Sequence, residues 1–137
     1  MSEPLTPAQL QERLDASPFI RSLGLRVTEA DAARQCITMT AEMRPEFERG
    51  AGSGQWHGGP IAAIIDTVGD YALVMGLGRP VPTINFRVDY LRPAVNTALT
   101  ITASVRRAGR SVGVVDVDVM DANGAVVAIG RATYSTA

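Results

Sequence analysis

A long apolar segment dominates this sequence at residues 57–75, HGGPIAAIIDTVGDYALVM. From Gly59 to Met75 it is apolar on nearly every side, which predicts a helix buried in the core rather than one on the surface. Its two acids, Asp66 and Asp70, share a stripe with glycines and alanines. Because those neighbours are small, the stripe leaves room for another group to approach the helix backbone.

Downstream of this helix, apolar and polar residues alternate, which is typical of strands. Residues 83–90 predict a half-buried strand with Ile84, Phe86, Val88 and Tyr90 on its apolar side. Further strands are predicted at 99–105, 112–120 and 126–134, with turns at 107–110 and at 121–124, where Asn-Gly is a hairpin signal. A buried helix followed by an antiparallel meander predicts an α+β fold with the sheet wrapped against the helix. An unpaired sheet edge at the end of such a meander favours dimerisation.

Upstream of the helix the pattern is shorter and more broken. Thr6, Pro7 and Gln9 form a helix-start signal, and Ser17-Pro18 is expected to end that helix after Ala16. Two strands are predicted between residues 25 and 43 with a turn near 30–32, and residues 44–56 form a glycine-rich loop. No repeat or linker divides the chain, so we expect one domain over residues 1–137.

Composition excludes several chemistries. All thirteen basic residues are arginines, so a P-loop, a pyridoxal Schiff base and a Ser-Lys hydrolase have no lysine to use. One cysteine and one histidine cannot build a Cys/His zinc site or an intrachain disulfide. A net charge of −1 argues against nucleic acid as a partner. The N-terminus has no signal-peptide pattern, and two acids interrupt the apolar segment, so we expect a cytoplasmic protein that does not enter a membrane.

The candidate chemistry is concentrated at the start of the long helix. Gly58 and Gly59 follow His57 there, and a helix start presents unpaired backbone N–H groups that can form an oxyanion hole for a carbonyl oxygen. Asp66 follows about two turns later, and a buried carboxylate needs partners. Spacing alone is also compatible with purely structural roles for these residues: a tight turn at the glycines, a histidine that only forms hydrogen bonds, and an aspartate bonded to a neighbouring loop.

Several motifs together resemble one known family. They are SPFI…LGL at 17–25, HGGPIAAIIDT at 57–67, TINFRVDYLRP at 83–93, RAGR at 107–110 and AIGRATY at 128–134. In these motifs the chain resembles the hotdog-fold acyl-CoA thioesterases of the PaaI-like branch, over nearly its whole length. The resemblance implies a long central helix wrapped by a curved antiparallel sheet of five to six strands, paired into a homodimer and often into a tetramer.

The resemblance also implies how the site works. Gly58 offers its N–H to the thioester carbonyl, next to His57, and Asp66 of the other subunit acts as general base or nucleophile. The hydroxyl of Thr83 helps to hold the water. The leaving group is coenzyme A, which belongs to the substrate, so no separate cofactor is implied. Further predicted substrate contacts are Gln55, Trp56, Gly59 and Asp70, with Arg107 and Arg110 near the CoA phosphates. Trp56 has a second reading, in which it packs the loop against the sheet.

Two positions depart from the family pattern. Ala51 occupies a place that usually holds Asn or Gln, and Asp70 one that often holds a small or hydroxyl residue. Because Asp70 follows Asp66 by one turn, we expect either a mutual effect of the two carboxylates on protonation or a contact of Asp70 with substrate. An enoyl hydratase of this fold is rejected because its second catalytic residue is missing. The alternatives to the hydrolase are a non-catalytic acyl-CoA-binding protein and a purely structural role.

Overall fold

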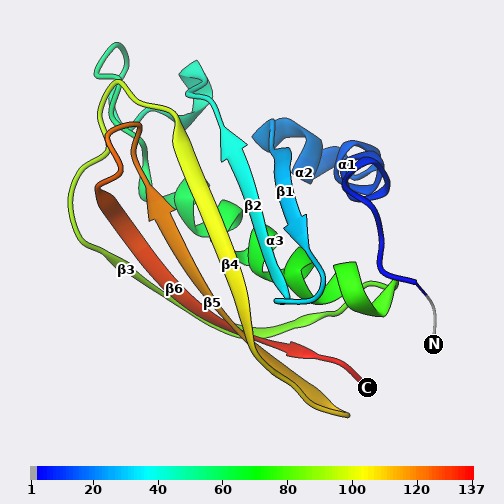
Figure 1. The fold of residues 1–137 in the computed structure, drawn as a ribbon. Helices are drawn as coiled ribbons and strands as arrows, with labels where there is room; N and C mark the ends of the chain where they lie inside the picture. The colour runs from blue at the N-terminus through cyan, green and yellow to red at the C-terminus, as the bar shows by residue number, and fades with distance from the viewer. Residues whose placement is uncertain (1–2) are drawn as a thin grey trace.

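An antiparallel sheet of six strands curves around one long helix, α3 (Gly58–Leu77), in the computed structural model, which describes residues 3–137 (Figure 1). The predicted α+β layout of a central helix wrapped by a curved sheet is therefore confirmed. The other elements are α1 (Pro7–Ala16), α2 (Pro18–Leu23), β1 (Arg26–Asp31), β2 (Cys36–Ala41), a 3₁₀ turn (Pro45–Phe47), β3 (Thr83–Tyr90), β4 (Leu99–Ala108), β5 (Val112–Met120) and β6 (Val126–Ser135).

The strand order is β1-β2-β4-β5-β6-β3. The last three strands form a meander as predicted, but the strand of residues 83–90 does not lead into it: β3 pairs with β6 instead of β4, in a register that sets Val88 opposite Gly130, and β6 is therefore internal. The sheet therefore ends at β1 on one side and at β3 on the other. β3 forms the outer edge of the curved sheet in Figure 1, and it directly follows α3 in the chain.

The core lies between α3 and the concave face of the sheet. Alternation along β5 turns Val115, Val117 and Val119 toward α3 and leaves Asp116 and Asp118 on the outer face. By length and composition α3 could cross a membrane, but most of it is buried inside the fold. Its apolar character is explained by this central position. The buried residues of α3 include Ile61, Ile64, Ile65, Val68, Ala72, Leu73, Val74 and Met75.

The N-terminal segment differs from its prediction in two respects. The capping box at Thr6 is present, with Gln9 bonded to it in both directions. Ser17-Pro18 ends α1 as expected, but Pro18 also starts a second helix, α2. Proline suits a first helical position because the N–H that it lacks has no partner there. The first turn between strands is also later than predicted, because β1 continues to Asp31 and the Asp31 side chain accepts from the backbone N–H of Arg34 at 3.0 Å.

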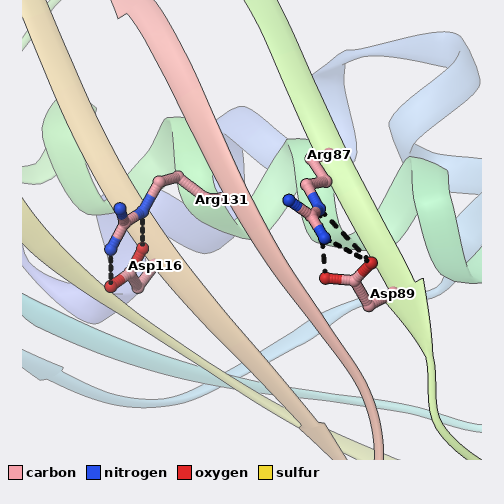
Figure 2. Close-up of polar contacts among 4 residues, drawn as sticks. All are labelled: Arg87, Asp89, Asp116 and Arg131. Carbon is pink, nitrogen blue, oxygen red and sulfur yellow. Dashed lines mark hydrogen bonds and ion pairs between the residues drawn. The ribbon is translucent and has the colours of Figure 1, made fainter.

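Charged side chains cover the outer face of the sheet. Arg131 on β6 and Asp116 on β5 form two hydrogen bonds of 2.6 and 2.9 Å, and Arg87 and Asp89 pair along β3 (Figure 2). The Arg131 guanidinium holds the pKa of Asp116 below its usual range. Both pairs lie on the side of the sheet away from α3, so this surface is polar.

β3 is the main departure from the predicted burial. Its alternating pattern predicts a half-buried strand, yet Ile84, Phe86 and Tyr90 are 54%, 40% and 53% exposed. The strand does alternate, but it stands at the sheet edge, and α3 covers its apolar side only in part, through Val88 and the Tyr90 hydroxyl. The chain alone therefore exposes an apolar edge strand.

Candidate active site

Two contacts fix the start of α3. The backbone N–H of His57, the N-cap residue, donates to the Phe47 carbonyl at 2.8 Å, and the Tyr90 hydroxyl donates to the Gly58 carbonyl at 2.6 Å. Burial raises the pKa of Tyr90, so this hydroxyl remains a donor. The His57 side chain does not cap the helix, which leaves the N–H groups of the first turn available to a ligand. A negative charge that develops near them is stabilised by the helix dipole.

A cavity of about 380 Å³ opens at this helix start. We call it the helix-start cavity. The predicted site residues Gln55, Trp56, His57 and Gly58 line it, together with Arg49, Tyr90 and Arg92, which sequence reasoning did not assign to the site. The YLRP motif at 90–93 was the available signal for Tyr90 and Arg92, because this segment runs past the helix start.

The contacts of Trp56 are mainly structural. Its ring stacks on Phe47 with centroids 5.4 Å apart, and its indole N–H donates to the Thr97 carbonyl at 2.9 Å. These contacts hold the glycine-rich loop against the sheet, in agreement with the packing reading of this residue. Gly59 is exposed, and a Cβ added there would meet no atom within 4 Å.

Asp66 stands in the middle of α3, half-buried, with Thr83 beside it. The Thr83 hydroxyl donates to the Asp66 carboxylate at 2.8 Å, so the structure joins two of the predicted catalytic residues. The Asp66 backbone carbonyl accepts from the Tyr134 hydroxyl at 2.7 Å. Gly69 makes that contact possible, because a Cβ at this position would lie 2.5 Å from the same hydroxyl oxygen.

Asp66 and Asp70 both border a second cavity, of about 750 Å³, between α3 and the α1–α2 segment. We call it the α1–α3 cavity. Its lining is Arg13, Ala16, Ser17, Phe19, Ile20, Ala63, Asp66, Thr67, Asp70, Tyr71, Val74 and Pro80. Burial, with a smaller contribution from Asp66, raises the pKa of Asp70 to about 7. Within residues 3–137 the Asp70 carboxyl has neither a hydrogen bond nor an ion pair, so its polar atoms are free to meet a ligand.

The two parts of the site are separate within one chain. Gly58 and Asp66 are eight residues apart on α3, which places them about 12 Å apart along the helix axis. They also border different cavities. A single carbonyl group therefore cannot contact both the Gly58 N–H and the Asp66 carboxylate of the same chain.

The predicted arginines of the β4–β5 hairpin lie elsewhere. Arg107 and Arg110 are exposed and line neither cavity. Their neighbour Arg106 forms an ion pair with Asp116 at 3.6 Å on the outer face of the sheet. Among residues 3–137, no group of three His, Cys, Asp or Glu side chains is arranged to hold a metal ion.

Comparison with known proteins identifies the family. The sequence profile of the thioesterase superfamily matches residues 53–128, more than half of the chain. The chain belongs to the thioesterase superfamily. This thioesterase is 34% identical to a Halobacterium salinarum protein named as an esterase, over 93% of this chain and 89% of that one. It is 30% identical to the medium/long-chain acyl-CoA thioesterase YigI of Salmonella typhimurium, over 85% and 84% of the two chains.

Structural comparison agrees with the predicted hotdog fold. The thioesterase superimposes on the Escherichia coli PaaI protein from the phenylacetic acid degradation operon with a TM-score of 0.78 at 24% identity, over 91% of this chain and 88% of that one. The resemblance to the acyl-CoA thioesterase family is confirmed by the superfamily match and by the YigI relative, and the protein is a thioester hydrolase. The matched residues 53–128 include Gly58, Asp66 and Thr83.

Proposed function

We propose that this protein is a cytoplasmic acyl-CoA thioesterase in which Asp66 and the start of α3 form the catalytic centre. The observation that carries the proposal is the Asp66 carboxylate, held by the Thr83 hydroxyl at 2.8 Å and bordering a largely apolar cavity. A carboxylate in this position can accept a proton from a water molecule that approaches a bound thioester.

The reaction needs a hydrogen-bond donor for the developing oxyanion as well as a base. The free N–H of Gly58 at the helix start supplies it, because an oxyanion gains stabilisation from a preorganised donor and from the helix dipole. Tyr90 supports this role by holding the Gly58–Gly59 peptide, next to this donor, through the Gly58 carbonyl. His57 and Gln55 border the same cavity and would contact the thioester from its sides.

Two chemical routes use these groups. With Asp66 as general base, water adds to the thioester carbon, its proton passes to the carboxylate, and the tetrahedral oxyanion collapses with cleavage of the C–S bond. With Asp66 as nucleophile, the carboxylate first displaces the thiolate to form an anhydride, which water then hydrolyses. Both routes yield a carboxylic acid and coenzyme A, and both require only a carboxylate and an oxyanion donor from the protein.

The complete centre requires a second copy of the chain. Gly58 and Asp66 of one chain are about 12 Å apart along α3, so we propose that Gly58 of one subunit faces Asp66 of its partner. The exposed apolar side of β3, at a sheet edge, is suited to a homodimer contact, and the dimer can pair again into a tetramer. The partner also covers the apolar side chains that the single chain leaves exposed.

The cavities support one orientation of the substrate in this proposal. The α1–α3 cavity carries apolar side chains such as Phe19, Ile20 and Val74 and borders Asp66, so we place the acyl group there. The YigI relative is named for medium- and long-chain acyl-CoAs, and an apolar acyl group of that kind suits this lining. Thioester and leaving group then extend toward the helix-start cavity of the partner.

The test is thiol release by the wild-type protein and by Asp66→Asn across acyl-CoAs from acetyl to long-chain, phenylacetyl and benzoyl. We expect turnover by the wild type and a loss of at least about a hundredfold in kcat for the variant, since the amide cannot take a proton. Full activity of Asp66→Asn would refute its catalytic role. Binding of acyl-CoAs without turnover by the wild type would favour the non-catalytic alternative.

A further inference from the structure

The helix-start cavity is unusual in its charge. Two arginines from different segments border it, Arg49 in the loop before α3 and Arg92 in the loop after β3, and no Asp or Glu does. The nearby carboxylate of Glu48 instead accepts from the Gly54 N–H at 2.7 Å and lies outside the lining. The partial positive charge of the helix start adds to these two charges. The cavity therefore favours an anion.

Both arginines differ from most others in this chain. Arg34, Arg87, Arg106 and Arg131 form ion pairs, and Arg13, Arg44 and Arg79 donate to backbone carbonyls. Within residues 3–137 the guanidinium groups of Arg49 and Arg92 have neither an ion pair nor a hydrogen bond. An arginine that has no protein partner keeps all of its donors for a ligand, and the guanidinium fork matches the geometry of phosphate.

The backbone holds both residues in place. The Arg49 N–H donates to the Gln55 carbonyl at 2.9 Å, and the Arg92 N–H donates to the Val127 carbonyl at 3.3 Å. Between them, the Trp56 N–H donates to the Ala94 carbonyl at 2.9 Å, which ties the two loops together. The two side chains thus extend from anchored positions on both sides of the helix start.

We propose that Arg49 and Arg92 bind the phosphate groups of the coenzyme A leaving group. This inference rests on the proposed function, because a thioester whose carbonyl reaches Gly58 must direct its leaving group out of the helix-start cavity. Both arginine side chains are exposed, which suits phosphates joined to the thioester by a long flexible arm. It differs from the sequence prediction of Arg107 and Arg110, which border neither cavity.

The test compares two esters of one acyl group, the CoA thioester and the pantetheine thioester, which lacks the phosphates. In Arg49→Gln/Arg92→Gln we expect KM for the CoA ester to rise about tenfold or more, with kcat within twofold and KM for the pantetheine ester unchanged. The rise of KM with added salt should also be weaker in this variant than in the wild type. Arg26→Gln, an exposed arginine on β1 at the opposite sheet edge, is the matched control and should keep the wild-type KM.

Three results would overturn the inference. The first is a KM for the CoA ester that stays at the wild-type value in the double variant. The second is an equal rise of KM for the CoA ester and for the pantetheine ester. The third is a rise of KM for the CoA ester that appears only in Arg107→Gln/Arg110→Gln. Failure of the proposed function would look different, because the wild type would then release no thiol from either ester. Even then, calorimetric titration with free coenzyme A and with pantetheine tests whether Arg49 and Arg92 bind the phosphates. If they do, the double variant should bind coenzyme A about tenfold more weakly than the wild type does.

Discussion

The hydroxyl of Thr83, at the start of β3, donates to the carboxylate of Asp66, in the middle of α3, over 2.8 Å. This bond ties the edge strand of the sheet to the central helix at the acid on which the proposed chemistry depends. It also orients the carboxylate, because one of its two oxygens is held by the hydroxyl and the other remains for water. The predictions below begin with this pair.

Replacing Thr83 should affect the chemical step more than binding. Thr83→Val keeps the shape of the side chain but removes the donor, and a hydrogen bond to a charged group contributes about 1.5–3 kcal/mol. We expect kcat to fall about tenfold or more with KM changed little, while Thr83→Ser retains most of the activity. Steady-state kinetics on one acyl-CoA checks this. A wild-type kcat for Thr83→Val would show that the hydroxyl does not orient Asp66.

Asp70 should make the stability of the fold depend on pH. Its pKa is raised from 3.8 to about 7, so the folded chain holds this proton more tightly than the unfolded chain does. The free energy of unfolding therefore falls as pH rises from about 4 to about 7, by at most about 4 kcal/mol from this group. Asp70→Asn cannot ionise and should remove this fall.

Urea unfolding of the wild type and of Asp70→Asn at pH 5 and pH 8 measures the effect. The variant should gain stability relative to the wild type at both pH values, and clearly more at pH 8 than at pH 5, because the fall is only partly complete at pH 5. Asp118→Asn, at an exposed position on β5, is the control and should follow the wild type. The same pH dependence in wild type and Asp70→Asn would contradict the prediction.

Two glycines of α3 should respond in opposite directions to alanine. A Cβ at Gly69 would lie 2.5 Å from the Tyr134 hydroxyl oxygen, whereas a Cβ at Gly76 would meet nothing within 4 Å. We expect Gly69→Ala to destabilise the fold by about 1–3 kcal/mol through overpacking. Gly76→Ala should be neutral or stabilise by up to about 1 kcal/mol, because alanine favours the helix.

The cause of the Gly69 effect can be isolated in a double variant. Tyr134→Phe removes the oxygen that the new methyl group would strike, and the next atoms lie at 3.4 and 3.5 Å, which is ordinary contact. Gly69→Ala should therefore cost much less stability in the Tyr134→Phe background than in the wild type. Equal costs in the two backgrounds, measured by denaturant unfolding, would rule out this clash as the cause.

The apolar side of β3 should hold the subunits together. Phe86→Arg places a charge at an exposed apolar position on the edge strand, so we expect it to yield single chains without thioesterase activity. Asn85→Arg adds the same charge one residue earlier, where the side chain points to the other face, and should stay dimeric. Light scattering after size-exclusion chromatography reports the mass. A wild type that is monomeric and active would contradict the two-subunit site.

Local patterns were enough to predict most elements of this fold. The helix of residues 58–77 follows from a segment that is apolar on nearly every side, and the strands of the meander follow from period-two alternation. The capping box at Thr6 was readable because it involves residues only three apart. The second helix at Pro18 was missed because one proline signals both the end of one helix and the start of the next.

Contacts between residues that are distant in the sequence could be identified only from the folded structure. Asp66 meets Thr83 and Tyr134, which are 17 and 68 residues away, and Arg49 and Arg92 flank one cavity from different loops. Periodicity tells which side of an element is apolar, but not which element covers it, because strand order depends on loop closure and packing over the whole chain. The residue types and the start of α3 are thus local properties of the sequence. The free edge at β3, the two cavities and the separation of Gly58 from Asp66 arise only when the sheet closes around the helix.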